Sequence, residues 1–237
     1  MLAILFMLAL SDEPGIQDNS LLTEEAYNQE PAIVQHINFF QRDARTHEWI
    51  YTFTQEWPAP AQKHQLSYTI PLQTGNRIGD LALNYRYQLA GNSDAKFAAA
   101  PRFTIMFPTG DWRRGAGNGA VGYNLAMATS FAPVEEWNFH FDAGLITVPH
   151  SHGTSHAFNL ADNVVYRPAK RINFMVETVF NREDGENSLR VSPAVRWAYN
   201  FANGLQIVPA IGFPIGVGPS AGERAAILYL SFEHPFR

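Results

Sequence analysis

The sequence predicts an all-β fold, a transmembrane antiparallel up-and-down β-barrel of about twelve strands. Apolar and polar residues alternate through segments of about nine to eleven residues, the length of a tilted strand that crosses a membrane. The apolar faces carry mostly Phe, Tyr, Trp, Leu and Ile. The opposite faces carry Gly, Ala, Asn, Thr and Arg rather than the Lys and Glu of a solvated surface. Charged residues make up only 16% of the 237-residue chain, against roughly 25% in soluble domains.

Residues 97–107 show the alternation clearly. Phe97, Phe103, Ile105 and Phe107 share one face, whereas Arg102 and other small or polar residues occupy the opposite face. A period of two residues indicates a strand. The same pattern predicts strands at residues 33–41, 49–57, 64–72, 81–89, 97–107, 121–127, 137–145, 158–166, 172–180, 189–199, 205–215 and 226–236.

Two features interrupt this pattern. Asp162 falls on the apolar face of residues 158–166, so we expect either a β-bulge that shifts the register there or a strand with other bounds. Proline also removes a ladder hydrogen bond, and a closed barrel has no free edge on which to place it. Bulges or lost ladder bonds are therefore expected at Pro71, Pro101, Pro193, Pro209 and Pro214.

A soluble sandwich or barrel would show the same alternation with its apolar face inside. The large apolar side chains are too bulky to fill one barrel interior, so we expect them to face lipid and the small polar faces to line a lumen. Aromatic residues at strand ends, such as Trp49, Trp137 and Tyr199, suit interfacial girdles. The last strand ends in alternating apolar residues and Phe236, which resembles the assembly signal of outer-membrane barrels.

The chain before residue 33 falls into two expected parts. Residues 1–11 are apolar over about the length of a signal-peptide core and are interpreted as a signal-peptide remnant. Residues 12–32 are polar and acidic, and are expected to be a periplasmic lead-in or a plug in the lumen, with a short helix from Ser20. Residues 33–237 are expected to form the barrel. Twelve strands return the C-terminus to the side of residue 33, so the longer connections, such as 108–119, face outward.

Several short phrases resemble a known family. They are EEAYNQEP (24–31), VQHINFF (34–40), TQEWP (54–58), HQLSYTIP (64–71) and FPTGD (107–111). Together they resemble the putative outer-membrane proteins of the MetA-pathway of phenol degradation family. The resemblance implies a barrel in the outer membrane of a Gram-negative bacterium and passage of small hydrophobic or aromatic compounds. It carries over no binding residue.

On this basis the expected function is passive uptake through a channel, with outer-membrane lipid and lipopolysaccharide as surroundings. A nucleic-acid partner is not expected, because the net charge is −5 and Lys and Arg do not cluster. The oligomeric state is left open. A purely structural barrel and an outer-membrane lipid hydrolase are the alternatives, although no enzyme activity is expected.

The charged residues of the small polar faces are the candidates for lining the lumen. Opposed charges of this kind either constrict a pore and tune its selectivity or pair into a network that closes the barrel. The candidates are Glu56, Asp80, Arg86, Arg102, His140, Asp142, Glu177, Arg190 and Arg196, with His36 also assigned to the lumen.

Two loops carry further candidates. His150, His152 and His156 form a weak candidate metal site, but no Cys or carboxylate joins them, so no metal or other cofactor is expected. The same histidines lie beside Ser151 and Ser155, which with Asp162 as the acid are the local candidates for lipid hydrolysis. In residues 111–118, Trp112, Arg113 and Arg114 are candidates for contact with lipopolysaccharide.

Overall fold

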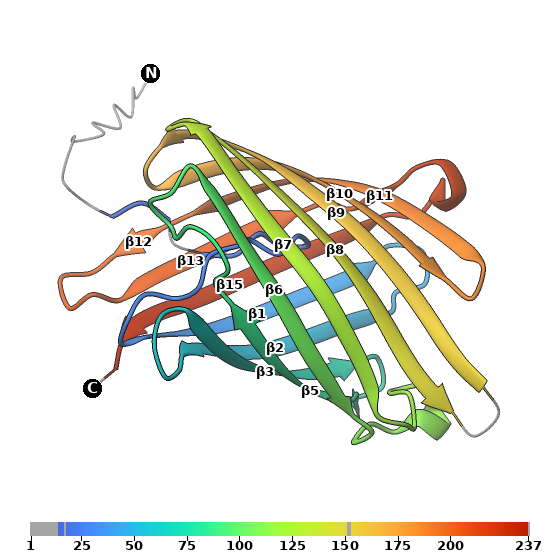
Figure 1. Cartoon of the computed structure of the whole chain (residues 1–237). Helices are drawn as coiled ribbons and strands as arrows, with labels where there is room; N and C mark the ends of the chain where they lie inside the picture. Colours follow the sequence, from blue (N-terminus) through green and yellow to red (C-terminus); the bar gives the residue numbers. More distant parts are fainter. Residues whose placement is uncertain (1–13, 17, 151–152, 237) are drawn as a thin grey trace.

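The computed structural model describes residues 14–16, 18–150 and 153–236, and these are almost entirely β-structure. The sheet has fifteen strands, of which three have two residues each, β4 (Arg77–Ile78), β12 (Tyr199–Asn200) and β14 (Ile215–Gly216). The other twelve form the barrel wall (Figure 1). They are β1 (Ile33–Asp43), β2 (Trp49–Pro58), β3 (His64–Gln73), β5 (Leu81–Tyr87), β6 (Phe97–Phe107), β7 (Gly122–Val134), β8 (Trp137–His150), β9 (Gly153–Ala169), β10 (Ile172–Glu183), β11 (Glu186–Trp197), β13 (Gln206–Gly212) and β15 (Ala225–Pro235).

The barrel closes because its first and last strands pair. Neighbours along the chain pair antiparallel around the wall, and β1 pairs with β15 from Ile33↔Pro235 to Asp43↔Ala225. β13 connects the remaining strands, pairing with β15 on one side and β11 on the other. Closure leaves no edge with unpaired backbone groups, as a membrane interior requires. The predicted up-and-down barrel of twelve strands is confirmed.

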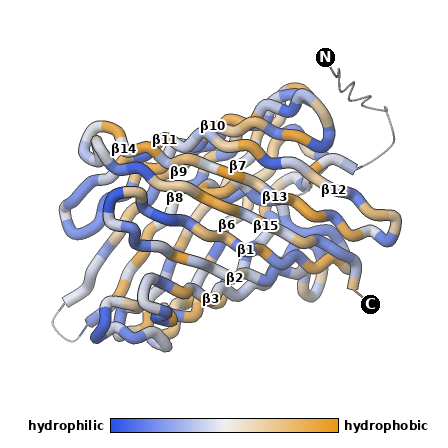
Figure 2. The backbone as a smooth tube through the Cα atoms, turned by 180° about the vertical axis from the view of Figure 1, so that it is seen from behind, coloured by the Kyte–Doolittle hydropathy of each residue, from blue (hydrophilic) through white to orange (hydrophobic). Residues whose placement is uncertain are grey.

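Side chains alternate between the two faces of the wall as predicted. On β7, Leu125 is 63% exposed on the outer surface, whereas Ala128 faces inward and is 1% exposed. Figure 2 shows hydrophobic residues recurring along the strands. In the described residues the only helices are the 3₁₀ turns η1 (Trp112–Arg114) and η2 (Gly218–Ser220). Neither of these is long and apolar enough to cross a membrane.

The expected bulge at Asp162 is wrong. β9 pairs in continuous register with β8 and β10 on both sides of this residue, with Asp162 opposite Phe141 and Thr178. Its side chain therefore lies on the outer face. The register shifts of these strands fall elsewhere, between Phe131 and Val134 and between Ile172 and Phe174, where hairpins turn.

The prolines within the strands also disturb the register little. Pro71, Pro101, Pro193 and Pro209 each pair with a residue in an unshifted ladder. A single missing donor removes one ladder bond without moving the neighbouring pairs. Only Pro214 coincides with a break, between the end of β13 and the start of β14.

Both ends of the described chain lie at one end of the barrel, and the longer connections lie at the other (Figure 1). We call these the terminal end and the loop end. The loop end includes η1, η2 and the paired ends of β8 and β9 at His150 and Gly153. The proposed signal-peptide remnant, residues 1–11, lies outside the described residues.

Candidate functional site: an occupied lumen

Residues 18–30 lie inside the barrel, and we call them the interior segment. In Figure 1 this part of the chain, drawn in blue, enters at the terminal end, turns near the middle of the barrel and returns to the start of β1. It contains no helix, contrary to the expectation of one from Ser20. Its backbone donors instead bond to side chains of the wall, so a helical ladder is not needed to satisfy them.

Wall side chains accept hydrogen bonds from six backbone N–H groups of the interior segment. Glu177 accepts from Leu22 and Thr23, at 2.8 and 2.9 Å. Asp142 accepts from Glu24 at 2.9 Å. The remaining bonds of this kind run from Ala26 to Ser130 (2.9 Å), from Asn28 to Gln88 (2.9 Å) and from Gln29 to Gln65 (2.7 Å).

With Gly15 just before it, the interior segment is hydrogen-bonded to every strand of the wall. The wall partners, in order around the barrel, are Gln35, Glu56, Gln65, Arg86, Arg102, Ser130, Asp142, Asn163, Glu177, Arg196, Gln206 and Tyr229. The segment is therefore held from all sides of the lumen rather than resting on one wall.

Glu24 is the centre of one ionic cluster. Its Oε1 lies 2.7 Å from Nη1 of Arg86, and its Oε2 accepts from Arg102. Arg86 is 2% exposed and also donates to the backbone carbonyls of Glu25 and Tyr27. A buried guanidinium needs such acceptors to offset the loss of water. Arg86 therefore ties the interior segment to β5 through both a carboxylate and the backbone.

Glu25 is the centre of a second cluster. Arg196 lies 3.2 Å from its Oε1 and donates to the carbonyls of Asp18 and Asn19, both at 2.8 Å. The imidazole of His140 lies 3.6 Å from Oε2 of Glu25. Two cationic side chains on opposite parts of the wall, from β5 and β11, thus bind consecutive carboxylates of one short segment.

The surroundings shift the pKa values of three carboxyl groups of the interior segment. Burial favours the neutral form of Glu24, but Arg102 and Arg86 outweigh it and the pKa is lowered. The same balance holds for Glu25, whose pKa is lowered because His140 and Arg196 outweigh burial. Burial dominates at Asp18 and raises its pKa to about 7, despite the opposing charge of Arg196.

Two cavities flank the interior segment. The one toward the loop end, which we call the chamber, has a volume of about 320 Å³. Its apolar lining includes Ile37, Phe39 and Tyr229, and its neutral polar lining includes Thr52 and Thr69. Glu24, Glu56 and Arg102 also line it. The second cavity, about 200 Å³, lies toward the terminal end and is lined by residues such as Gly15, Glu30, Asn138, Arg167 and Glu233.

Most of the predicted lumen candidates lie together at the interior segment. Glu56, Arg86, Arg102, His140, Asp142, Glu177 and Arg196 all face inward there. The other two lie near the loop end. Asp80 accepts from the backbone N–H groups of Gly110 (3.0 Å) and Asn118 (2.7 Å), and Arg190 pairs with Glu223 at 2.8 Å.

The assignment of His36 to the lumen is wrong. It lies on the outer face, where its ring stacks on Phe53 and His234 at centroid distances of 6.1 and 5.4 Å. Its neighbour Gln35 faces inward and is fully buried. The physical reason is the parity of β1, whose pairing with β15 puts Gln35 opposite the inward Glu233 and His36 opposite the outward Phe232.

The neutral members of the site were not among the predicted residues, since the prediction was limited to charged side chains. Gln65, Gln88, Ser130, Asn163 and Tyr229 supply six further hydrogen bonds to the interior segment. The alternation of faces along each strand could have identified them, since each lies two positions from a small or charged residue that also faces inward.

The histidine loop is only partly described, since Ser151 and His152 lie outside the described residues. Within the described part no group of His and acidic residues could hold a metal ion. His156 lies near Thr147, with Nδ1 3.2 Å from Oγ1. Asp162 is six residues along β9 from His156, which separates them by about 20 Å. Asp162 is therefore out of reach as the orienting acid of a hydrolase.

Comparison with known proteins supports the fold. No protein-family model matches the sequence, and no curated protein matches it, so the resemblance to the phenol-degradation family is not confirmed. Among solved structures, the NanC porin has a TM-score of 0.61 at 11% identity, covering 83% of this chain and 98% of that chain. The COG4313 outer membrane channel from Pseudomonas putida F1 has a TM-score of 0.60 at 14% identity, covering 89% and 98%.

The KdgM porin in complex with disordered oligogalacturonate has a TM-score of 0.58 at 10% identity, covering 86% of this chain and 99% of that chain. All three are porins or outer-membrane channels with barrels of similar length. Together with the apolar outer surface, these likenesses confirm the predicted fold and agree with a location in the outer membrane of a Gram-negative bacterium. The chain has the fold of an outer-membrane channel barrel.

Proposed function

We propose that this protein is an outer-membrane channel for small hydrophobic or aromatic solutes, and that the interior segment is a plug which must move for a solute to pass. The observation that carries the proposal is the polar lumen occupied by a segment with a cavity on each side. A barrel that served only as an anchor would need neither the polar interior nor the cavities.

The lining of the chamber supports a solute that is partly apolar. Ile37 and Phe39 offer an apolar surface, while the neighbouring Thr52 and Thr69 and the Glu24–Arg102 pair offer hydrogen-bonding groups. Its volume of about 320 Å³ is at the lower end of the range of roughly 300 to 1,000 Å³ for small-molecule sites. An aromatic ring with one or two polar substituents fits such a lining.

Conductance in planar bilayers tests the channel role. The full chain should open rarely, whereas a variant that lacks residues 14–30 should conduct steadily, because the segment that crosses the lumen is gone. Phenol or benzoate added on one side should reduce the current of the shortened variant by entering the chamber. A folded shortened variant that never conducts would contradict the proposal.

A purely structural barrel is the second candidate, favoured by the hydrogen bonds between the interior segment and every strand. On that account the segment is a permanent part of the core. Its deletion would then lower the thermal stability of the barrel without producing solute-dependent current. Stability and conductance measured on the same shortened variant separate the two functions.

A further inference from the structure

Asp162 places a carboxylate on the membrane-facing surface near mid-depth. It lies near the centre of β9 and on the same face as the exposed Phe158 and Leu160. Tyr166, which packs against Trp137 at a centroid distance of 4.9 Å in the expected aromatic girdle, is four residues away. Four residues along a strand span about 13 Å. A charged group at this depth is costly and marks a functional site by default.

No described side chain offsets that cost. Within the part of the chain that the structure describes, no hydrogen bond or ion pair reaches the Asp162 carboxylate. Beyond the ladder of the sheet, the backbone carbonyl of Asp162 accepts from the hydroxyl of Thr23 inside the barrel at 3.2 Å. The neighbouring outer-face Thr178 is the cross-strand partner of Asp162. Its hydroxyl adds a second polar group at the same position.

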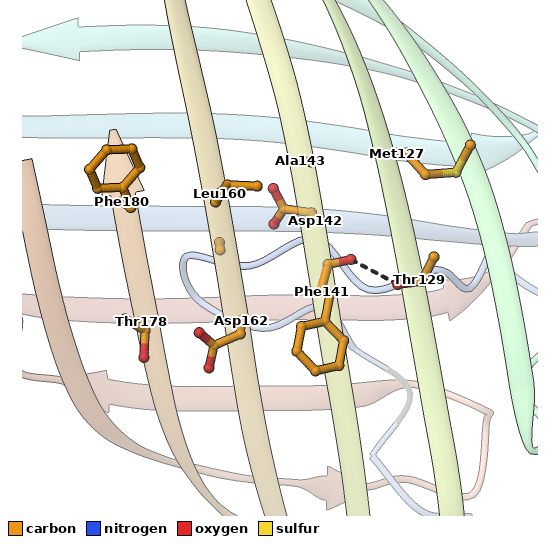
Figure 3. A pocket seen from close by; sticks show the side chains of 10 residues that line it. Met127, Thr129, Phe141, Asp142, Ala143, Leu160, Asp162, Thr178 and Phe180 are labelled. Atoms are coloured by element: carbon orange, nitrogen blue, oxygen red, sulfur yellow. Dashed lines mark hydrogen bonds between the residues drawn. The ribbon is translucent and has the colours of Figure 1, made fainter. Parts of the chain in front are cut away.

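Asp162 lies in an indentation of the outer surface of about 500 Å³ (Figure 3). Met127, Phe141, Leu160 and Phe180 supply its apolar lining. The volume is within the range of roughly 300 to 1,000 Å³ for small-molecule sites. An apolar hollow with one carboxylate and one hydroxyl is complementary to an apolar body that carries a cation or a strong hydrogen-bond donor.

The charge distinguishes between possible occupants. Acyl chains of lipid fill the hollow but bring no donor, and lipid headgroups lie at the surface. A second copy of this chain brings no cation at mid-depth, because the described outer-face arginines, such as Arg42 and Arg182, lie at strand ends. A face-to-face pair of copies would instead bring two Asp162 carboxylates together.

We propose that this indentation is a lateral binding site for a membrane-dissolved amphiphile with a cationic amine. The ammonium group pairs with Asp162 and donates to Thr178, and the apolar body lies along Phe141, Leu160 and Phe180. The site is separate from the lumen, since the barrel wall lies between them, and it does not depend on the proposed channel function.

Quenching by a brominated probe tests the site in reconstituted vesicles. In a background whose five native tryptophans are replaced by Phe, Phe141→Trp reports from the indentation, and Phe53→Trp reports from the outer face of β2, near the middle of that strand. Bromododecylamine should half-quench Trp at 141 at a concentration at least tenfold lower than at 53. Bromododecanol, which has the same chain without the charge, should quench the two positions alike.

Two variants separate the site from nonspecific partition. Asp162→Asn should remove the tenfold preference, and adding Asn38→Asp, a carboxylate at the middle of β1, should not restore it. Equal quenching by the amine at both positions, or a preference unchanged by Asp162→Asn, would overturn the proposal. Crosslinked dimers that depend on Asp162, without preference for the amine, would overturn it in favour of a second copy.

Discussion

Glu24→Gln tests how firmly charge holds the interior segment. The substitution keeps an acceptor oxygen but leaves Arg86 and Arg102 without their shared counterion. Removing one partner of a buried ion pair costs about 3–5 kcal/mol. Glu24 and Arg102 keep 23% and 22% exposure, so solvent screening reduces the expected cost to about 2–3 kcal/mol.

At about 1.4 kcal/mol per factor of ten, displacement of the interior segment should become roughly 30 to 150 times more frequent. The assay is the frequency of channel opening in planar bilayers, with chymotrypsin cleavage after Leu21, Leu22 or Tyr27, which both variants retain, as a second measure. Glu30→Gln is the matched control, because among the described residues the Glu30 carboxylate accepts only from the neutral Gln62 and Ser93, both at 2.8 Å. Equal opening and equal cleavage in the two variants would refute the reasoning.

Three further predictions concern the buried carboxyl of Asp18, the loop held by Asp80 and the outer face of the wall at Leu125. The raised pKa of Asp18 stabilises the docked segment below its ordinary pKa of 3.8, and this stabilisation is lost as the pH rises through about 7. Opening should therefore increase as the pH rises from about 4 to about 7, and Asp18→Asn should reduce that increase. Asp80→Ala should speed proteolysis within residues 108–119, since two backbone bonds from that loop are lost, and an unchanged cleavage rate would contradict this role. Leu125→Arg should lower the free energy of unfolding in vesicles by about 2–4 kcal/mol, whereas the inward Asn124→Arg should change it much less; equal losses would mean that the faces are misassigned.

The strands of the wall could be predicted from the sequence because large apolar residues alternate with small or polar residues along most of them. The prediction ended β7 at Met127, seven residues short of the observed end at Val134. Beyond Met127 the inward residues are small and the outward Thr129 is polar, so the two faces look alike in sequence. Continuous pairing with β8 extends the strand there, and pairing is a tertiary property.

The site was predictable only in part. Strand parity puts Arg86, Glu177 and Arg196 inside, but nothing in the local pattern says what they bind. Their partners come from a segment up to 178 positions away, as in the bond from Arg196 to Asp18. That segment has no regular periodicity, because its conformation is set by acceptors on the wall rather than by its own residues.

The lowered pKa values of Glu24 and Glu25 predict how docking of the interior segment changes at acid pH. Their contribution to docking is complete above the ordinary pKa of 4.5 and is lost as the pH falls through their lowered values. Opening should thus also increase in strong acid, where both carboxylates become protonated and release Arg86 and Arg196. An opening frequency that stays constant down to pH 3 would contradict the ionic clusters as the anchors.

Reversible crosslinking of the interior segment to the wall tests the central claim most directly. The chain has no cysteine, and the side chains of Ser20 and Asn163 meet at 2.6 Å. Ser20→Cys with Asn163→Cys, joined by a short reducible thiol reagent, should abolish channel openings, and reduction should restore them within the same bilayer. Openings of unchanged frequency and size while the crosslink is intact would show that solutes do not pass by displacement of residues 18–30.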